Sequence, residues 1–143
     1  MPAEAIFQPF AGMLVLTFLV WLLLYKRRIG YMRANRIHPQ KVSTPDTREL
    51  LLQGAVSFPA HNFRNLLELP VMFYAACLYV YVTGSVDAAY VYAAWWFFLF
   101  RIVHSVIHCT NNRVYWRFYA YAVSSLGLWF MVARIVADVI ARQ

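Results

Sequence analysis

Long apolar runs with few charges are separated by polar connections along the whole chain. The first two runs, Ile6–Tyr25 and Leu69–Val86, contain no charged residue, and the last two carry charges only near their ends. A membrane-spanning α-helix needs about 20 mostly apolar residues, whereas the strict alternation of a membrane β-strand is missing from these runs. We therefore predict an all-α membrane protein, a four-transmembrane-helix bundle that forms one domain over residues 1–143. The expected spans are about residues 6–25, 66–86, 88–107 and 118–140.

Composition supports a membrane protein over other classes. Of the 143 residues, 62% are hydrophobic and only 13% are charged, against about 45–50% and about 25% in an average soluble domain. A small soluble domain has proportionally more surface to cover with polar groups. The composition therefore excludes a soluble enzyme and a disordered chain, and the two cysteines form no disulfide or metal motif. We expect a lipid bilayer as partner and no nucleic acid.

The positive charge is concentrated in one connection. The chain carries a net charge of +7, and eight of its thirteen lysines and arginines lie between the first two predicted spans. Cytoplasmic loops are enriched in such residues, so we place the first and third connections in the cytoplasm and both termini on the other side. The basic residues follow the first apolar run instead of preceding it, which is the wrong order for a signal peptide.

Prolines divide the long first connection into segments. Thr44 followed by Pro45 and an acidic residue is typical of a helix start. Pro59 is expected to begin a second segment that runs into the membrane. Pro70 is expected to bend that segment, because proline cannot donate the helical hydrogen bond.

The second span opens with a polar stripe. At about 100° per residue, His61, Asn65, Glu68 and Met72 fall on one helix face, with Arg64 beside it. One interpretation is an Arg64–Glu68 ion pair at the membrane surface, worth a few tenths of a kcal/mol. The other is the wall of a polar pocket, since ionisable residues at membrane depth are costly.

The third span ends with Arg101, His104 and His108 on one face. Two histidines four residues apart can ligate a metal, but the chain has only four histidines and no further ligands accompany this pair. We therefore predict no metal site and expect these side chains to form hydrogen bonds or bind an anion.

The fourth span begins with another polar stripe, formed by Arg113, Arg117, Tyr121 and Ser124. One interpretation of this stripe is that the arginines orient the helix in the membrane and that the tyrosine lies at the membrane surface, as is common in membrane proteins. Three spans, however, place polar stripes at their cytoplasmic ends. This convergence predicts a pocket that opens to the cytoplasm and suits a small anionic ligand with an ammonium group.

Three motifs carry a resemblance to a known family: Asn65-x-x-Glu68 before Pro70, Arg101-x-x-His104 and Arg117-x-x-x-Tyr121. Together with four spans in about 140 residues, they resemble the MAPEG family, the membrane-associated proteins in eicosanoid and glutathione metabolism. The stretch Asn62–Tyr74 is similar to the small bacterial members. The resemblance implies a homotrimer in a bacterial inner membrane, with glutathione bound as co-substrate between neighbouring subunits near the cytoplasmic face.

The resemblance also implies roles for individual residues. Arg117 and Tyr121 match the catalytic pair, with Arg117 stabilising the glutathione thiolate. Glu68 matches the residue that pairs the amino group of glutathione, and Arg33 matches one that reaches a carboxylate. The full set of expected glutathione contacts, in which His108 and Arg113 come from the polar stripes, is Arg33, Arg64, Asn65, Glu68, Arg101, His104, His108 and Arg113.

Two functions remain open at this point. The first is a glutathione transferase or peroxidase that acts on lipophilic electrophiles from the bilayer. The second is a non-catalytic protein on the same fold, a lipid-binding or partner-binding membrane subunit. His108 and Phe118 stand where the family's enzymes commonly have a tyrosine and a small hydroxyl residue, and Pro70 follows Glu68 sooner than in the eicosanoid enzymes. These departures argue against a specific eicosanoid chemistry.

Overall fold

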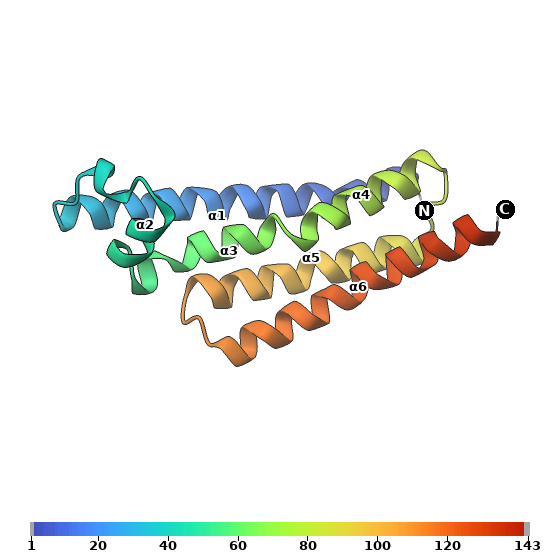
Figure 1. The fold of residues 1–143 in the computed structure, drawn as a ribbon. Helices are drawn as coiled ribbons and strands as arrows, with labels where there is room; N and C mark the ends of the chain where they lie inside the picture. The colour runs from blue at the N-terminus through green and yellow to red at the C-terminus, as the bar shows by residue number, and fades with distance from the viewer. Residues whose placement is uncertain (1, 142–143) are drawn as a thin grey trace.

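Four helical rods run side by side along the length of the molecule (Figure 1). The structure, a computed structural model, describes residues 2–141, and no strand occurs within that range. Three rods are single helices and the second is built from two. In order the rods are α1 (Phe7–Ala34), α3 (Phe58–Leu66) with α4 (Leu69–Val82), α5 (Ala88–Cys109) and α6 (Val114–Ala141). The short elements are η1 (Ala3–Ile6), η2 (Pro39–Val42), α2 (Pro45–Leu51) and η3 (Gly54–Val56).

All four rods are long and apolar enough to cross a membrane. The chain is therefore an integral multi-pass membrane protein in a lipid bilayer. α1 and α6 each contain 28 residues, which at about 1.5 Å per residue exceeds the ~30 Å hydrocarbon core. α1 continues past the predicted end at Tyr25 to Ala34, because lysine and arginine are good helix formers and can extend a helix into water.

The second rod differs most from the predicted span. It begins at Phe58, with Pro59 in the first turn, and it breaks at Leu67 and Glu68 before Pro70. The predicted bend is thus a full interruption of the helix, where Glu68 has φ −97° and ψ −102°. The rod ends at Val82 and not at residue 86, since the chain turns at Gly84 with φ +64°.

The predicted helix start in the first connection is confirmed. α2 begins at Pro45, and the Thr44 hydroxyl accepts a hydrogen bond from the backbone N–H of Thr47 at 3.3 Å. A side-chain oxygen at this position satisfies one of the free N–H groups of a helix start.

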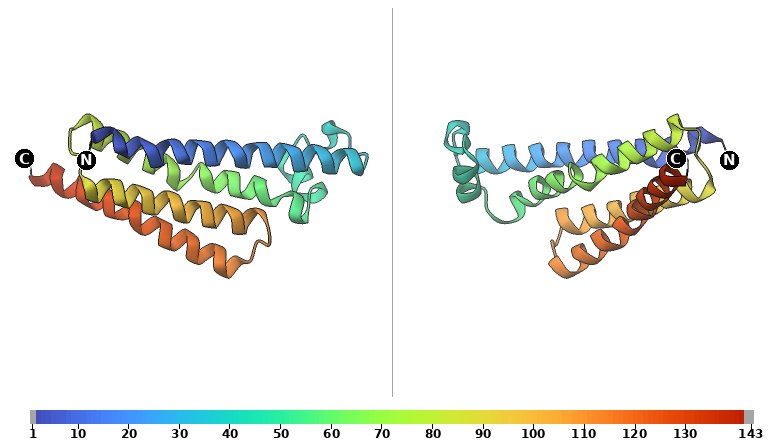
Figure 2. Two further views of the ribbon diagram at one scale, coloured as in Figure 1. Left: turned by 180° about the vertical axis from the view of Figure 1, so that it is seen from behind. Right: turned by 45° about the vertical axis from the view of Figure 1, so that its right-hand side comes forward.

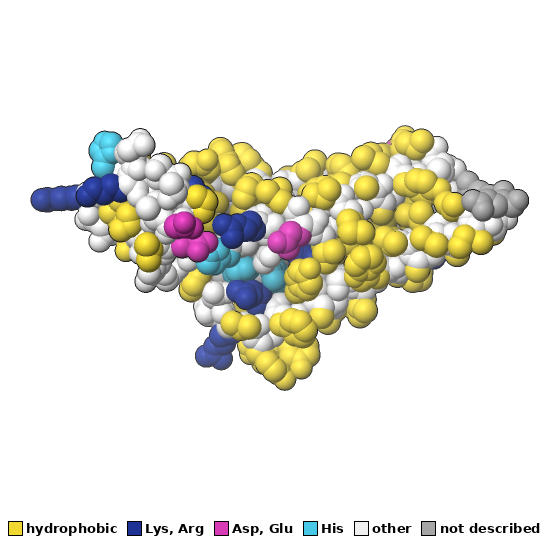
Figure 3. Space-filling model, in the orientation of Figure 1, with side chains coloured by type: hydrophobic (Ala, Val, Ile, Leu, Met, Phe, Trp, Pro, Cys, Tyr) yellow, Lys and Arg dark blue, Asp and Glu magenta, His cyan; other side chains and the backbone are white. Residues whose placement is uncertain are grey.

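The molecule has two distinct ends, which are clear in both views of Figure 2. The terminal end holds the two chain termini and the turn between α4 and α5. The loop end holds η2, α2, η3 and the turn between α5 and α6. Hydrophobic side chains cover most of the face seen in Figure 3, and charged side chains and histidines gather toward the loop end.

Close backbone contact joins α5 to α6. A Cβ atom added at Gly127 would lie 2.7 Å from the Ala93 carbonyl oxygen, so only glycine allows this approach. Close by, the indole N–H of Trp96 donates to the Val123 carbonyl oxygen at 2.8 Å. One turn along α5 from Ala93, the rings of Phe73 and Phe97 stack with centroids 4.6 Å apart. Small residues at helix contacts are typical of membrane bundles.

Four polar residues at the terminal end, Asp87, Tyr90, Arg134 and Asp138, form what we call the terminal cluster. Arg134 donates two hydrogen bonds to Asp87, at 2.7 and 3.0 Å, and its guanidinium carbon lies 4.3 Å from the centre of the Tyr90 ring. The Tyr90 hydroxyl donates to Asp138 at 3.2 Å. Asp87 also accepts the Tyr90 backbone N–H at 2.9 Å and so caps α5. The hydrogen bonds from Arg134 hold the pKa of the Asp87 carboxyl below its usual value.

Candidate functional site

Buried polar side chains collect at the loop half of the bundle, mostly on one face of α5. The buried ones are Asn62, Arg101, His104, Ser105, His108 and Ser124. Polar groups in a membrane bundle are expensive to bury without partners, so the hydrogen bonds of this group decide what it does.

Arg101 is fully buried, yet its guanidinium lacks a well-placed acceptor. Its carbon lies 4.6 Å from the centre of the Tyr121 ring and 5.1 Å from that of Phe97. Tyr121 acts on the guanidinium electrostatically and through a weak side-chain hydrogen bond, and Glu68 acts on it electrostatically. None of its three nitrogens makes a hydrogen bond of standard geometry to a residue within 2–141, and no carboxylate pairs it there. Because an arginine stays charged, this group is a strong donor held ready for an anion.

His104 supplies the complementary acceptor. Its Nδ1 lies 3.0 Å from the Arg117 carbonyl oxygen. A carbonyl only accepts, so Nδ1 carries the proton, and in a neutral imidazole Nε2 is then a bare acceptor. Nε2 is buried and has no partner in the described part of the chain. The ring also faces Tyr121, with centroids 5.8 Å apart.

Arg117 is fixed by two neighbours. It donates to the Asn112 side-chain oxygen at 2.5 Å and to His108 Nε2 at 3.1 Å. Since arginine can only donate, His108 Nε2 is the acceptor and its Nδ1 carries the proton. The Asn65 side-chain amide lies 3.4 Å from that Nδ1. Because Nδ1 donates, the amide accepts through its oxygen, which exchanges places with the nitrogen when the amide group is turned by 180°. The chain Asn112–Arg117–His108–Asn65 thus connects α6, α5 and α3.

Asn62 holds α3 against α5 and was not among the predicted residues. It is fully buried, donates to the Cys109 sulfur at 3.4 Å and accepts from the Ser105 hydroxyl at 3.5 Å. It lies one turn before Asn65, which places it on the same polar stripe. That spacing was the signal that could have identified it.

Asn112 was also missed, although the chain gives a sign of it. It has φ +47° in the turn between α5 and α6, and asparagine tolerates this left-handed conformation better than most residues. The residue with this left-handed backbone, Asn112, is also the one whose side-chain oxygen accepts the short hydrogen bond from Arg117. An Asn-Asn pair between two apolar runs marks such a turn.

The predicted stripe on the second rod is interrupted at Glu68. Arg64 and Glu68 are both exposed, and the Arg64–Glu68 ion pair does not form, since the ion pair found within residues 2–141 is Arg134–Asp87. The helix break turns Glu68 away from the α3 register, so the stripe does not continue to Met72. Asn65 remains half-buried against His108.

Two predicted contacts lie apart from this cluster within one chain. Arg33 is exposed in the last turn of α1, beside Ile37 and His38. Arg113 is exposed and precedes α6, which begins at Val114 and not at Arg113 as the stripe implied. Neither side chain has a hydrogen bond or ion pair to another described residue. Tyr121 and Ser124 do follow Arg117 along α6, and the Ser124 hydroxyl donates to the Tyr121 carbonyl at 2.8 Å.

The arrangement offers donors and an acceptor to one small ligand. Arg101 and Arg117 supply positive charge, and His104 Nε2 supplies a buried acceptor. The Tyr121 ring lies against both Arg101 and His104. His104 and His108 have ring centroids 5.4 Å apart, and no group of three or more metal-ligating side chains occurs among the described residues. The chemistry therefore favours recognition of an anion that also carries a hydrogen-bond donor.

Comparison with known proteins gives one match. The model of the MAPEG family matches residues 6–137, which is nearly the whole chain. No curated protein and no solved structure shows a significant match.

Proposed function

The chain belongs to the MAPEG family, and on that basis we propose that it is a membrane-bound glutathione transferase with peroxidase activity toward lipophilic electrophiles. Membership itself indicates a membrane function in glutathione or lipid metabolism. The proposal adds the thiol chemistry and the residues that perform it.

The observation that carries the proposal is the buried, unpartnered pair of Arg101 and His104 Nε2. An arginine without an acceptor in a low-dielectric bundle is costly, and an acceptor without a donor beside it adds to that cost. Glutathione supplies both missing partners, because it carries two carboxylates along with amide, thiol and ammonium donors. An anion without a hydrogen-bond donor would leave His104 Nε2 unsatisfied.

The other residues can be assigned by their charge. Glu68 lies exposed at the helix break, where it pairs the glutathione ammonium. Arg64 and Asn65 border the same side of the site, and His108 positions Arg117. Arg33 cannot reach this cluster within one chain, so we assign it to the site of a neighbouring subunit in a homotrimer. A mass of three chains in native mass spectrometry tests that assembly.

We assign Arg117 the role of stabilising the glutathione thiolate. A nearby guanidinium in a water-poor site favours the thiolate over the thiol. The thiolate sulfur then attacks an electrophilic carbon, a C–S bond forms, and the leaving group departs with its electron pair. Tyr121, beside Arg101 and His104, can donate a hydrogen bond to the reacting atoms.

Thermal unfolding of the detergent-solubilised protein with millimolar glutathione tests binding. A ligand that binds only the folded state raises the free energy of unfolding by RT ln(1 + [L]/Kd), about 2.7 kcal/mol at 100 Kd. S-methylglutathione is the matched control for the thiol, since it keeps both carboxylates and the ammonium group. The proposal fails if glutathione shifts neither the unfolding temperature nor the turnover of an aromatic electrophile.

One observation favours the non-catalytic alternative, a lipid-binding or partner-binding subunit. Arg117 is already engaged by Asn112 and His108, which leaves it fewer free donors for a thiolate. Glutathione binding without turnover of any electrophile, together with a sulfur pKa unchanged from that of free glutathione, would support this second function. Ultraviolet absorbance of the bound thiolate measures that pKa.

A further inference from the structure

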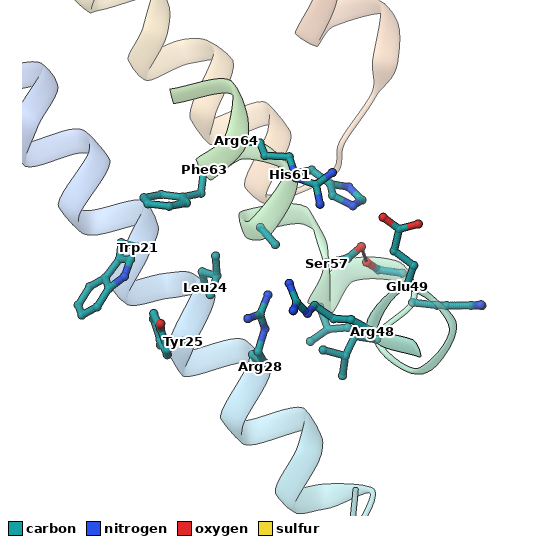
Figure 4. Close-up of a pocket in the computed structure, with 15 residues that line it drawn as sticks. Trp21, Leu24, Tyr25, Arg28, Arg48, Glu49, Ser57, His61, Phe63 and Arg64 are labelled. Atoms are coloured by element: carbon teal, nitrogen blue, oxygen red, sulfur yellow. Dashed lines mark hydrogen bonds between the residues drawn. The ribbon is translucent and has the colours of Figure 1, made fainter. Parts of the chain in front are cut away.

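A cavity of about 600 Å³ lies at the loop end, between α1 and the α2–η3–α3 segment. None of the buried polar residues around Arg101 lines this cavity, and Arg64 lies at the border of the cavity (Figure 4). The proposed glutathione chemistry uses neither Arg28 nor Arg48, the two arginines inside it. A volume of this size suits a small molecule or one end of a lipid.

The charges of the cavity are unbalanced. Its walls carry three arginines, Arg28, Arg48 and Arg64, against one glutamate, Glu49. No hydrogen bond or ion pair joins these four side chains to any residue within 2–141. Figure 4 shows Arg28 and Arg48 pointing toward each other across the cavity, and their charges repel. An anion between two guanidinium groups would replace that repulsion with charge-assisted hydrogen bonds.

The opposite half of the cavity is apolar and lies toward the bilayer. Trp21, Leu24 and Phe63 line it, and Trp21 stands in the uncharged run that precedes the basic end of α1. Arg27 donates to the Ala55 carbonyl oxygen at 3.2 Å and so holds η3 to α1. The cavity therefore has a charged half at the membrane surface and an apolar half at the depth of the acyl chains.

We propose that this cavity binds an anionic membrane phospholipid, with the phosphate between Arg28 and Arg48 and an acyl chain along Trp21, Leu24 and Phe63. Guanidinium groups match phosphate oxygens in bidentate geometry, and basic residues at the end of a span attract anionic lipids. Glutathione does not fit this description, because it is polar throughout and would leave the apolar wall uncovered. The site shares the border residue Arg64 with the proposed glutathione site but does not rest on the proposed transferase activity.

The test uses the full-length protein in neutral detergent, titrated with dioleoyl phosphatidylglycerol while the thermal unfolding temperature is recorded. Dioleoyl phosphatidylcholine has the same acyl chains without net charge, and inorganic phosphate has the charge without the chains. The proposal predicts a saturable rise with phosphatidylglycerol and little change with either of the others. An equal rise with phosphatidylcholine, or with inorganic phosphate alone, would overturn it.

Substitutions locate the effect. Arg28→Gln and Arg48→Gln should each weaken the phosphatidylglycerol effect about fivefold, and the double variant should weaken it more. Arg36→Gln is the matched control, since it removes the same charge from the same connection outside the cavity. If Arg28→Gln does not fold, Arg48→Gln carries the test, because Arg48 lies in the short helix α2 outside the bundle. An Arg48→Gln titration identical to that of Arg36→Gln would refute the site.

A glutathione titration of the same variants keeps the two proposals apart. Arg48→Gln should retain the glutathione response of the unsubstituted protein while its lipid response falls. Loss of both responses together would mean that the cavity belongs to the glutathione site, and the lipid proposal would then be wrong.

Discussion

The two ends of the bundle treat their polar side chains in opposite ways. At the terminal end, Arg134 makes two hydrogen bonds to Asp87, and the Tyr90 hydroxyl donates to Asp138. At the loop end, Arg101 is more deeply buried than Arg134 but has no well-placed acceptor among residues 2–141. An arginine thus has acceptors for its hydrogen bonds at the terminal end, and an arginine at the loop end lacks them.

We interpret this difference as one between groups that hold the helices together and groups that bind the proposed ligand. Groups that only hold helices together can find their partners inside the chain, as the terminal cluster does. A binding site must keep donors and acceptors free, and it loses stability until the ligand arrives. The terminal cluster is therefore an internal control for the loop-end site, and each prediction below changes one member of this comparison.

The largest effect is expected on turnover. Arg117→Ala should lower glutathione-dependent turnover by about 10²–10³-fold. This is the usual effect of removing one preorganised hydrogen-bond donor that stabilises a negative charge in an active site. Steady-state kinetics with an aromatic electrophile measures it, with Lys41→Gln as a control for loss of positive charge far from the site. Turnover that is equal in the two variants would remove Arg117 from the mechanism.

Next in size is the response of stability to removing each arginine. Arg101→Met should raise the free energy of unfolding of the ligand-free protein by about 1–4 kcal/mol, because it replaces an unpaired buried charge with an apolar chain. The same substitution should abolish the thermal shift with glutathione. Arg134→Met should do the reverse, lowering stability while the glutathione shift stays. Thermal unfolding of both variants with and without glutathione gives all four results.

A ligand-free Arg101→Met protein that melts at a lower temperature would contradict this expectation. It would show that Arg101 has a structural partner in the assembled protein, as an acidic group of a neighbouring subunit would provide. The loop-end site would then be satisfied in the same way as the terminal cluster.

A smaller effect is expected at Asp87, which both caps α5 and pairs Arg134. Asp87→Ala should cost about 1 kcal/mol through loss of the cap. Asp87→Asn keeps a capping oxygen and loses only the charge of an exposed pair, worth less than about 1 kcal/mol. Ranking the two variants by thermal unfolding separates the cap from the ion pair, and equal losses would assign the whole effect to the charge.

The smallest effect is a dependence on pH. Because Arg134 holds the folded-state pKa of Asp87 below its unfolded value, the carboxylate contributes full stability above about pH 4 and loses it as pH falls through the lower folded pKa. Thermal unfolding between about pH 2 and pH 6 should therefore show a decline that is smaller in Asp87→Asn. Identical pH profiles in the two proteins would exclude this linkage.

The sequence was sufficient to predict the helices and some of their boundaries. Apolar runs of about 20 residues predicted the rods, and Thr44 with Pro45 predicted the start of α2. The end of α1 was missed because the apolar run stops at the membrane surface, whereas the backbone hydrogen bonds continue to Ala34. Hydrophobicity reports burial in lipid and does not report where a helix ends in water.

The site was harder to predict than the fold, for a geometric reason. A 100° helical pattern assumes an unbroken helix, so it placed Asn65 and Glu68 on one face across a break that only Pro70 hinted at. It also could not distinguish Arg101 from Arg134, because both are single arginines in an apolar run. Which of them finds a carboxylate depends on contacts between helices, and no spacing along one helix contains that information.

The break between α3 and α4 gives the second rod a response to membrane thickness that an unbroken helix would not have. A continuous helix accommodates a thicker or thinner bilayer by tilting as one rod. The second rod instead has a joint at Leu67 and Glu68, where Pro70 removes a backbone hydrogen bond. Bending at this joint moves Glu68 relative to Asn65, and Asn65 contacts His108. If the proposed glutathione site is correct, vesicles of short-chain and long-chain lipids should give different glutathione affinities.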